Sequence, residues 1–580
     1  TGADVKNASA GSQQTSTGSR EFVVELNLYD EGAKKFADAT QTAYENGYTI
    51  GIYYDNEFIS VPKVSAHITD GNAVINGMSD YQTADNIAST IRIGALPVKL
   101  EEVRSQVVGA KLGQDAIHTS LLAGAIGLAV IILFMINVYR IPGLAASIAL
   151  CIYTMLVLII INVAGLTFTL PGIAGIILSI GMAVDANVII FERIKEELGT
   201  GKTVQSAMKI GFNKAFSAIF DGNMTTLTAA FVLGLKGSGA VKGFAYTLAI
   251  GIIVSMFTAL VITRLLLKLF YDFGAKNEQL YGVIKDTKTF NFIGKKNIFF
   301  CISAALILIG IVTVSVNGAR GKGMFNYGLD FKGGTSTTVT FNRDYSQSEI
   351  ESTIIPDIVS AIGDSTVQQQ KVQGGNDVVF KTNNLTIEQR EALEKLFTSK
   401  YGVEQSSILT ENISGAVSNE MKTDAVVAVI IATICMLLYI WFRFKDIRFA
   451  GSAVLALLHD VLVVVGFYAV ARITLGNTFI ACMLTIVGYS INATIVIFDR
   501  IRENLGQMGK ADLAEIVNAS ISQTMRRSVY TTLTTFIMVV ILFILGVSAI
   551  REFAAPLMVG IICGGYSSVC ITGALWYVLK

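Results

Sequence analysis

The chain has 580 residues, of which 52% are hydrophobic and 15% charged, and its mean hydropathy is +0.56. This composition is too apolar for a soluble globular protein and excludes that class. The net charge of +1 at pH 7 gives no sign of nucleic-acid binding through bulk positive charge.

The first 118 residues are polar and predict an α+β domain with a βαββαβ, ferredoxin-like order of elements. Residues 1–20 are expected to be a flexible or partial piece of this domain. A leading helix is expected ahead of Thr1, because the domain needs one to cross a membrane. Helices are predicted at 31–46 and 81–94, and strands at 21–28, 48–55, 57–64, 72–77 and, closing the domain, 98–108.

Apolar segments long enough to span a bilayer follow, and they recur to the end of the chain. Eleven spans are predicted, at 119–138, 143–163, 170–191, 216–234, 243–268, 297–316, 424–442, 448–470, 478–498, 528–547 and 554–578. All six cysteines lie inside these spans, so no disulfide framework is indicated and they are interpreted as small packing residues.

Lys and Arg gather in one set of short loops, which predicts that these loops are cytoplasmic. This set contains the loops after 138, 191, 442 and 498 and the tract at 268–296. Residues 1–118 and 317–423 then lie outside the cytoplasm.

A second polar segment lies between the sixth and seventh spans and repeats the pattern of the first. Helices are predicted within 346–363 and at 386–402, and strands at 334–342, 365–373, 377–383 and 406–415. The expected fold is therefore a polytopic α-helical membrane protein with an internal two-fold repeat and two exported ferredoxin-like α+β domains. The domain boundaries are placed at 1–118 (exported), 119–270 (five helices), 271–296 (cytoplasmic linker), 297–316 (leading helix of the second half), 317–423 (exported) and 424–580 (five helices).

The membrane parts of the two halves repeat in sequence. "GMAVDANVIIFERIKEELG" (181–199) aligns with "GYSINATIVIFDRIRENLG" (488–506), and "DGNMTTLT" (221–228) aligns with "RSVYTTLT" (527–534). Each half is therefore an exported domain followed by five helices.

Asp185 is a lone carboxylate in an apolar span, where a charge costs roughly 2.5–3.5 kcal/mol on insertion scales. Gly181 lies one turn earlier on the same face, and the repeat has Gly488 and Asn492 at that spacing. A glycine there lets a neighbouring helix approach closely, so Asp185 is expected to face a helix rather than lipid.

The next helix of each half has a polar stripe with a spacing of four and three residues. Asp221, Thr225 and Thr228 form the first stripe, and Arg527, Thr531 and Thr534 form the second. A pseudo-symmetric bundle is expected to bring the two stripes together at its centre, with Arg527 within reach of Asp185. His459 and Asp460 form another polar pair, about three turns into their predicted span.

Two interpretations of these charges remain open. Ion pairs that only hold helices together would explain them, and Glu192, Arg193, Asp499 and Arg500 are interpreted as interfacial flanks. Alternatively, a carboxylate in low dielectric gains stability by taking up a proton, so a pair that forms and breaks would couple protonation to conformation. The membrane potential supplies about 2.3 kcal/mol per charge per 100 mV.

The same residues resemble a known family. "GALPVKL" and "LPGIAGIILSIGMAVDANV" resemble SecD, whereas "YGLDFKGGT", "LLHDVLVVVGFYAV" and "GYSINATIVIFDRIREN" resemble SecF. Their order is similar to that of a fused SecDF, in the RND superfamily, over nearly the whole chain. The resemblance implies an accessory subunit of the Sec translocase, in the cytoplasmic membrane of a bacterium, that uses the proton motive force to complete protein export. It also implies the Sec channel complex with its auxiliary subunits, emerging preproteins and the lipid bilayer as partners.

The resemblance carries over to single positions. The family's relay aspartate in SecD matches Asp185, its arginine in SecF matches Arg527, and its D-x-N pair matches Asp221 and Asn223. The usual SecF motif has an aspartate where this chain has Ala493. Coupling is then expected to run through Asp185 alone, to use Asp460 or Asp221, to be weak, or to involve Na⁺.

Other classes were weighed against this one. An exporter of small molecules or lipids from the same superfamily is the alternative, and a scaffold that only anchors partners is a third. We expect no enzyme activity, no cofactor and no metal. "GTGKT" (199–203) lacks the spacing of a phosphate loop, and "YGLDFKGGT" (327–335) is expected to set a turn and a contact between domain and membrane.

Overall fold

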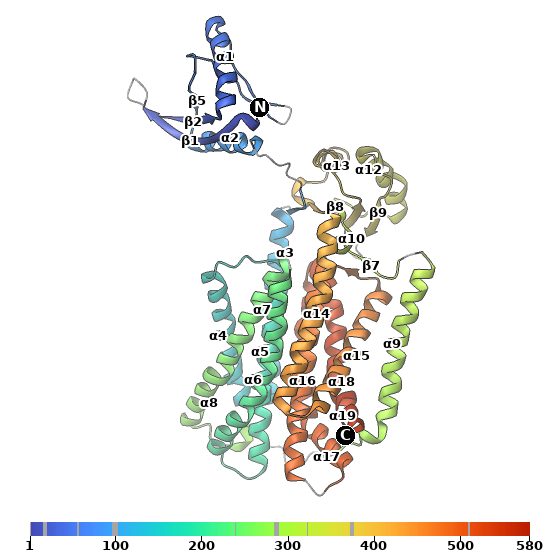
Figure 1. Cartoon of the computed structure of the whole chain (residues 1–580). Coiled ribbons are helices and arrows are strands. Elements are labelled where there is room, and N and C mark those ends of the chain that lie inside the picture. Colours follow the sequence, from blue (N-terminus) through green and yellow to red (C-terminus); the bar gives the residue numbers. More distant parts are fainter. Residues whose placement is uncertain are drawn as a thin grey trace. The chain divides into compact units, whose positions relative to one another are not determined.

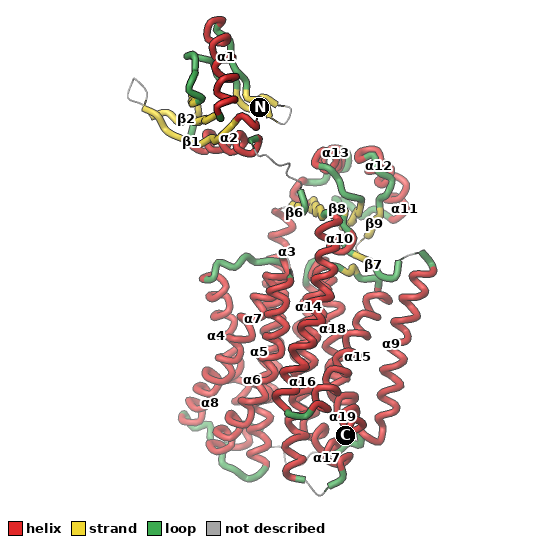
Figure 2. The backbone as a smooth tube through the Cα atoms, in the orientation of Figure 1, coloured by secondary structure: helices red, strands yellow, loops and turns green. Residues whose placement is uncertain are grey.

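The protein forms two compact units, Thr1–Glu102 and Val103–Lys580. The computed structural model describes residues 2–14, 20–54, 57–95, 102–108, 110–237, 239–282, 289–321, 323–371, 376–508 and 511–580 (Figure 1). Strands gather in the soluble parts of both units, and the remainder of the second unit is helical (Figure 2).

The first unit is an α+β domain built on a three-stranded antiparallel sheet in the order β1-β2-β5. Its elements are β1 (Val5–Gln14), β2 (Arg20–Leu28), α1 (Asp30–Asn46), β3 (Ile52–Tyr54), β4 (Glu57–Ser60), β5 (Asn72–Met78) and α2 (Tyr81–Gly94). The core joins Val24, Leu26 and Ile75 of the sheet to Ala84 and Ala88 of α2. These alanines lie four residues apart, so they share the helix face that packs on the sheet.

Residues 5–14, expected to be a flexible or partial piece of this domain, form its strand β1, whose backbone pairs with β2 from Val5 to Gln14. One prediction for this part of the chain was wrong. The strand expected to close this domain lies in the second unit instead, as β6 (Arg104–Val108) paired with β11. Strand pairing across about 300 residues leaves no local signal in the sequence.

The second unit begins with β6 and contains a five-stranded sheet in the order β6-β11-β8-β10-β9. The last four strands have the order of a ferredoxin-like fold, so the prediction for the second exported domain is confirmed. Its elements are β8 (Gly334–Thr340), α11 (Gln347–Glu349), α12 (Ile355–Ile362), β9 (Gln368–Lys371), β10 (Asp377–Thr382), α13 (Ile387–Ser399) and β11 (Ile408–Ile413). Val339, Phe380, Ile358 and Phe397 close its separate core.

The described residues contain eleven helices that are long and apolar enough to cross a membrane, which confirms each predicted span. Two of them, α7 and α18, continue through a π-helical turn into α8 and α19. The helices are α3 (Ala110–Tyr139), α4 (Ile141–Val163), α5 (Leu170–Gly199), α6 (Val204–Lys236), α7 (Ala240–Phe257), α8 (Thr263–Asp272), α9 (Lys296–Ala319), α14 (Gly415–Phe444), α15 (Ile447–Ala471), α16 (Asn477–Gln507), α17 (Leu513–Leu545), α18 (Ser548–Ser567) and α19 (Gly573–Leu579).

The helices α5 and α16 form the centre of the bundle. In their most apolar parts 94% and 89% of the residues are buried, against 11% for the peripheral α9. Helix α17 of the second half packs on α5, and α6 of the first half packs on α16 (Figure 1).

The two halves are related by an approximate two-fold axis. Phe244 and Phe553 occupy matching places in "FAYTLAIGII" and "FAAPLMVGII", and their rings meet with centroids 5.3 Å apart. A β-carbon at Gly181 would lie 3.2 Å from Cα of Thr535, and one at Gly488 would lie 3.1 Å from Cα of Thr226. Equivalent glycines therefore mark equivalent crossings between the halves.

Candidate ion-coupling site

Asp185 lies at the centre of the bundle, on the face of α5 that packs against α17. Its residue is 4% exposed, and Gly181, one turn earlier, allows α17 to approach. The expectation that Asp185 faces a helix rather than lipid is confirmed.

Asp185 and Arg527 line one small cavity, where α5, α16 and α17 meet. The cavity has about 10 Å³ of space, which is at the lower limit for a single water molecule. Its lining consists of Asp185, Ile189, Tyr489, Asn492, Ala493, Val496, Arg527, Ser528 and Thr531. Asn492, Ala493 and Thr531, predicted to lie beside the relay, therefore do lie beside Asp185.

Neither charged group of this cavity completes its hydrogen bonding. Among the described residues, Asp185 Oδ1 and Arg527 Nε and Nη2 have no hydrogen-bond partner, and no ion pair joins the two side chains. Arg527 is nevertheless within electrostatic reach of Asp185, and Thr534 lies beside the carboxylate. An unpaired buried charge is costly, so protonation or a bound cation would be favourable at Asp185.

Arg527 also lines a second, larger cavity of about 240 Å³, at the ends of α5 and α16 that lie away from the soluble domain. Ile189 and Val496, which are equivalent in the repeat, line both cavities as well. These three side chains therefore form the neck between the larger cavity and Asp185.

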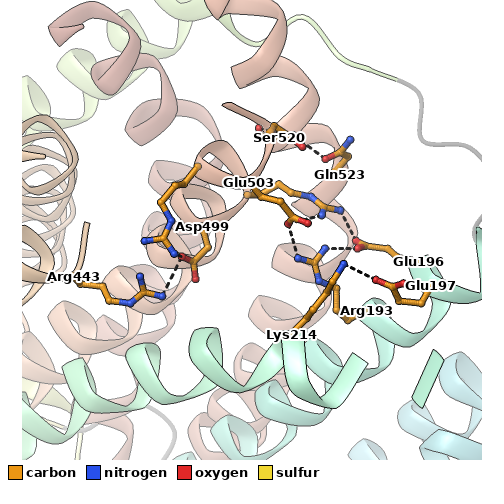
Figure 3. A network of polar contacts seen from close by, with 12 residues as sticks. Arg193, Glu196, Glu197, Lys214, Arg443, Asp499, Glu503, Ser520 and Gln523 are labelled. Atoms are coloured by element: carbon orange, nitrogen blue, oxygen red, sulfur yellow. Dashed lines mark hydrogen bonds and ion pairs between the residues drawn. The ribbon is translucent and has the colours of Figure 1, made fainter. Parts of the chain in front are cut away.

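The larger cavity is bounded by a symmetric ion-pair ring of Arg193, Glu196, Arg500 and Glu503. The repeat makes Arg193 equivalent to Arg500 and Glu196 to Glu503. Arg193 pairs across the axis with Glu503 at 2.6 Å, and Arg500 pairs with Glu196 at 2.8 Å (Figure 3). Each arginine also pairs within its own helix, at 2.7 Å and 3.0 Å. Arg193 and Arg500, which were interpreted as interfacial flanks, therefore also join the two halves.

Asp221 does not take part in the central cavity. It is buried, accepts a hydrogen bond of 2.8 Å from the Tyr439 hydroxyl, and forms an ion pair with Arg443 of α14. The expectation that the two polar stripes meet each other was therefore wrong, since α6 packs its stripe region on α16 and α14. Asn223, also predicted for the relay, donates to the carbonyl of Ile219.

Asp460 forms a separate network between α15, α16 and α18. Its carboxylate is fully buried and accepts hydrogen bonds from Ser490 at 2.5 Å and Ser567 at 2.7 Å, while His459 Nδ1 lies 2.9 Å away. A carboxylate with this many partners holds three helices together. The residues that line the small cavity do not include it.

Asn492 of α16 lies directly against Gly222 of the first half. A β-carbon at Gly222 would lie 1.9 Å from Asn492 Oδ1. Near this crossing the Thr226 hydroxyl donates to the carbonyl of Gly488 at 3.3 Å. Ala493, next along α16, exposes only a methyl group to the small cavity, so Asp185 is the only carboxylate among the residues that line it.

Comparison with known proteins decides the family. The family described as "Protein export membrane protein SecD/SecF, C-terminal" matches residues 92–272 and 392–580. "SecDF, P1 head subdomain" matches residues 1–98, and "SecD/SecF GG Motif" matches residues 325–344. The chain belongs to the SecD/SecF family of protein export membrane proteins.

Relatives named as SecDF cover almost the whole chain. The protein translocase subunit SecDF of Bacillus subtilis is 36% identical over 100% of this chain and 82% of its own length. That of Thermus thermophilus is 37% identical over 95% of this chain and 74% of its own. The crystal structure of SecDF from Thermus thermophilus superposes with a TM-score of 0.77 at 36% identity, covering 99% of this chain and 77% of that one.

The ion-pair ring escaped the sequence analysis although the repeat contained its signal. Arginine and glutamate stand three residues apart in both aligned segments, at the same two places. Equivalent residues at a two-fold axis face each other, so this pattern predicts cross pairs. The partner of Asp221 had no such signal. Arg443 directly follows the predicted span at 424–442, where a cation indicates only a cytoplasmic loop.

Proposed function

We propose that this SecD/SecF protein is an accessory subunit of the Sec translocase that uses the proton or sodium motive force to promote a late stage of protein export. The observation that carries the proposal is the shared cavity of Asp185 and Arg527, in which each group keeps polar atoms that have no hydrogen-bond partner among the described residues. The charges persist in the bundle at a cost, and a coupling role accounts for that cost.

The chemistry needed is the uptake and release of one cation. When Asp185 is charged, attraction favours the approach of Arg527 on α17 toward α5. When a proton or Na⁺ neutralises the carboxylate, this attraction is lost and α17 is free to take another position. A change of helix packing between halves then follows the occupancy of Asp185.

The larger cavity gives access to Asp185 from the end of the bundle that lies away from the soluble domain of the second unit. This cavity is lined by charged side chains that attract water and ions, and only Ile189, Val496 and Arg527 separate it from the small cavity. Movement of Arg527 would therefore change both the charge beside Asp185 and the width of the neck. The orientation from Lys and Arg places this side in the cytoplasm.

We propose that Asp221 and Asp460 stabilise the packing of neighbouring helices and do not bind the coupling ion. Both carboxylates already have partners, with an arginine and a tyrosine hydroxyl for Asp221 and two serine hydroxyls for Asp460. The coupling is then carried by Asp185 alone, which is consistent with Ala493 in place of a second carboxylate.

The partners follow from the names of the relatives, which are protein translocase subunits. We propose that the chain works beside the Sec channel complex and acts on the emerging preprotein. An exporter of small molecules or lipids remains the alternative, and it predicts transport that needs no preprotein and no channel.

The test is import of a radiolabelled preprotein into inverted vesicles that contain the Sec channel, with and without this chain, at saturating ATP. Parallel samples contain a protonophore, or have Na⁺ replaced by K⁺. We expect the chain to raise the yield of completed translocation only when one of the two gradients is present. Equal stimulation without either gradient would remove the coupling from the proposal.

A further inference from the structure

Residues 326–334, here called the docking segment, join the exported domain to the membrane bundle. Phe331 is 3% exposed and belongs to the apolar core of the membrane helices, whereas β8, which starts at Gly334, contributes to the separate core of the exported domain. The segment contains β7 (Asn326–Tyr327) and α10 (Leu329–Lys332). The expected contact between domain and membrane at this motif is present.

The docking segment is fastened to the turn between α15 and α16. Strand β7 pairs in parallel with β12 (Thr474–Leu475), and the Gly328 N–H donates to the carbonyl of Leu475 at 2.9 Å (Figure 1). A β-carbon at Gly328 would lie 3.4 Å from Cα of Gly476, so the two backbones approach closely here. On its other side, the carbonyl of Leu329 accepts a hydrogen bond from Ser418 of α14.

Asp330 of this segment caps the N-terminus of α16. Its Oδ2 accepts the backbone N–H of Asn477, the first residue of the helix, at 2.8 Å. Gly476, at the N-cap position, has no side chain to take this role, and a β-carbon there would lie only 2.7 Å from Asp330 Oδ2. A carboxylate at a helix N-terminus is also favoured by the helix dipole. Burial raises the pKa of Asp330, while this N–H and Arg104 oppose the rise.

The first half of the bundle is built differently at the equivalent position. Helix α5 is capped by its own Thr169, whose hydroxyl accepts the N–H of Gly172 at 3.1 Å. The repeat aligns Thr169 with Gly476. The second half thus has no side-chain cap of its own at this position and receives one from the docking segment. The α16 cap therefore also connects this helix to the exported domain, which the α5 cap does not do.

Helix α16 leads directly from this cap to the ion-coupling site. It carries Asn492, Ala493 and Val496 of the small cavity and, one to two turns further on, Arg500 and Glu503 of the ion-pair ring. Its central part is almost wholly buried between other helices. Because α16 is closely packed along its length, a displacement of its first turn is transmitted through the helix to the ion-coupling site.

We propose that Asp330 is a positioning residue that holds α16 to the exported domain of the second unit, so that movement of α16 at the ion-coupling site is passed on to this domain. This inference rests on the proposed function for its consequence in export. Asp330 touches no transported ion, and acts only through the N-terminus of α16.

A double variant can distinguish the capping of α16 from the connection of α16 to the exported domain. Asp330→Ala removes the cap and the side-chain link from the docking segment to α16, while the pairing of β7 with β12 remains. Asp330→Ala combined with Gly476→Ser restores a local cap without that link, because the extended backbone at 476 suits a serine N-cap and the carboxylate that would clash is gone. Asp330→Asn is the matched control, since its amide oxygen still accepts the Asn477 N–H. Each variant is compared with the parent for Tm in detergent and for gradient-dependent import into vesicles.

We expect Asp330→Asn to keep the gradient-dependent increment of import. The double variant should regain the Tm of the parent but lose that increment, down to the level measured without a gradient. Import by the double variant at the parent level would show that Asp330 is only a cap and would overturn the inference. A parent chain without any gradient response would instead contradict the proposed function.

A second measurement tests the connection without reference to export. Spin labels at Ser365→Cys in the exported domain and Gln507→Cys at the end of α16, in a background with the six native cysteines replaced by alanine, report one distance by pulsed electron resonance. We expect a narrow distribution in the parent and in Asp330→Asn, and a broad one in the double variant. An unchanged distribution in the double variant would also overturn the inference.

Discussion

Asp185 and Arg527 line the same small cavity, but within the described part of the chain no ion pair joins them and both keep polar atoms without hydrogen-bond partners. The two residues come from different halves, on α5 and α17, which pack together through Gly181. The unsatisfied pair therefore lies at the contact whose rearrangement would move one half relative to the other.

The first prediction concerns Ala493. Ala493→Asp places a second carboxylate in the small cavity, where it competes for Arg527 and repels Asp185, so the two carboxylates titrate as a coupled pair. We expect the present sequence to respond to the gradient already, and Ala493→Asp to change the pH dependence of import rather than to create it. Import across a pH series in both versions checks this. A response that appears only in Ala493→Asp would show that this chain has lost its coupling.

The second prediction concerns the ion-pair ring. Glu196→Gln and Glu503→Gln are matched variants, because the repeat makes the two glutamates equivalent. Each exchange loses one cross pair and one pair within a helix, each worth only about 0.2–1 kcal/mol at a partly exposed site, so stability should change little. Access to the larger cavity should increase in both. The rate of labelling of Ser217→Cys, which lines that cavity, measures this. Labelling rates equal to the parent's in both variants would speak against a closing role.

The third prediction concerns the crossing of α6 and α16. Gly222→Ala places a β-carbon 1.9 Å from Asn492 Oδ1, so the helices must separate or Asn492 must turn away. We expect a loss of about 1–3 kcal/mol, visible as a lower Tm in detergent. Gly451→Ala is the control, because no atom lies within 4 Å of its added carbon in α15, and it should stabilise by about 0.5–1 kcal/mol. A Tm for Gly222→Ala at or above the control's would contradict this packing.

The fourth prediction concerns orientation. Ser365→Cys in the exported domain should react with a membrane-impermeant maleimide added to intact cells, and Ser206→Cys in α6 should react only after permeabilisation. Both serines are exposed, and neither caps a helix, whereas Ser346 forms a capping box with Glu349 that a cysteine would break. The reverse pattern would invert the topology.

Some features of this protein follow from sequence because their signals are local. Each span is a continuous apolar run, and Gly181 beside Asp185 indicates a close helix neighbour through their spacing on one face. The repeat predicts the two-fold relation, which the contact of Phe244 with Phe553 confirms.

Other features depend on contacts between distant segments. Strand β6 pairs with β11 across about 300 residues, and Asp221 finds its partner Arg443 on a helix of the other half. The cap of α16 by Asp330 joins residues 147 positions apart. No periodicity or spacing specifies such partners. From the sequence alone, Asp221 was therefore predicted to be a relay residue, and the capping of α16 by the docking segment was not predicted.

The most direct test of the coupling role is gradient-dependent import with Asp185→Asn, which keeps the shape of the side chain and removes its charge. Asp460→Asn is the comparison, because it alters another buried carboxylate that lies outside the small cavity. With equal amounts of inserted protein in vesicles, we predict that Asp185→Asn loses the gradient-dependent increment and that Asp460→Asn keeps it. A normal increment in Asp185→Asn would contradict the account and reduce Asp185 to a structural residue.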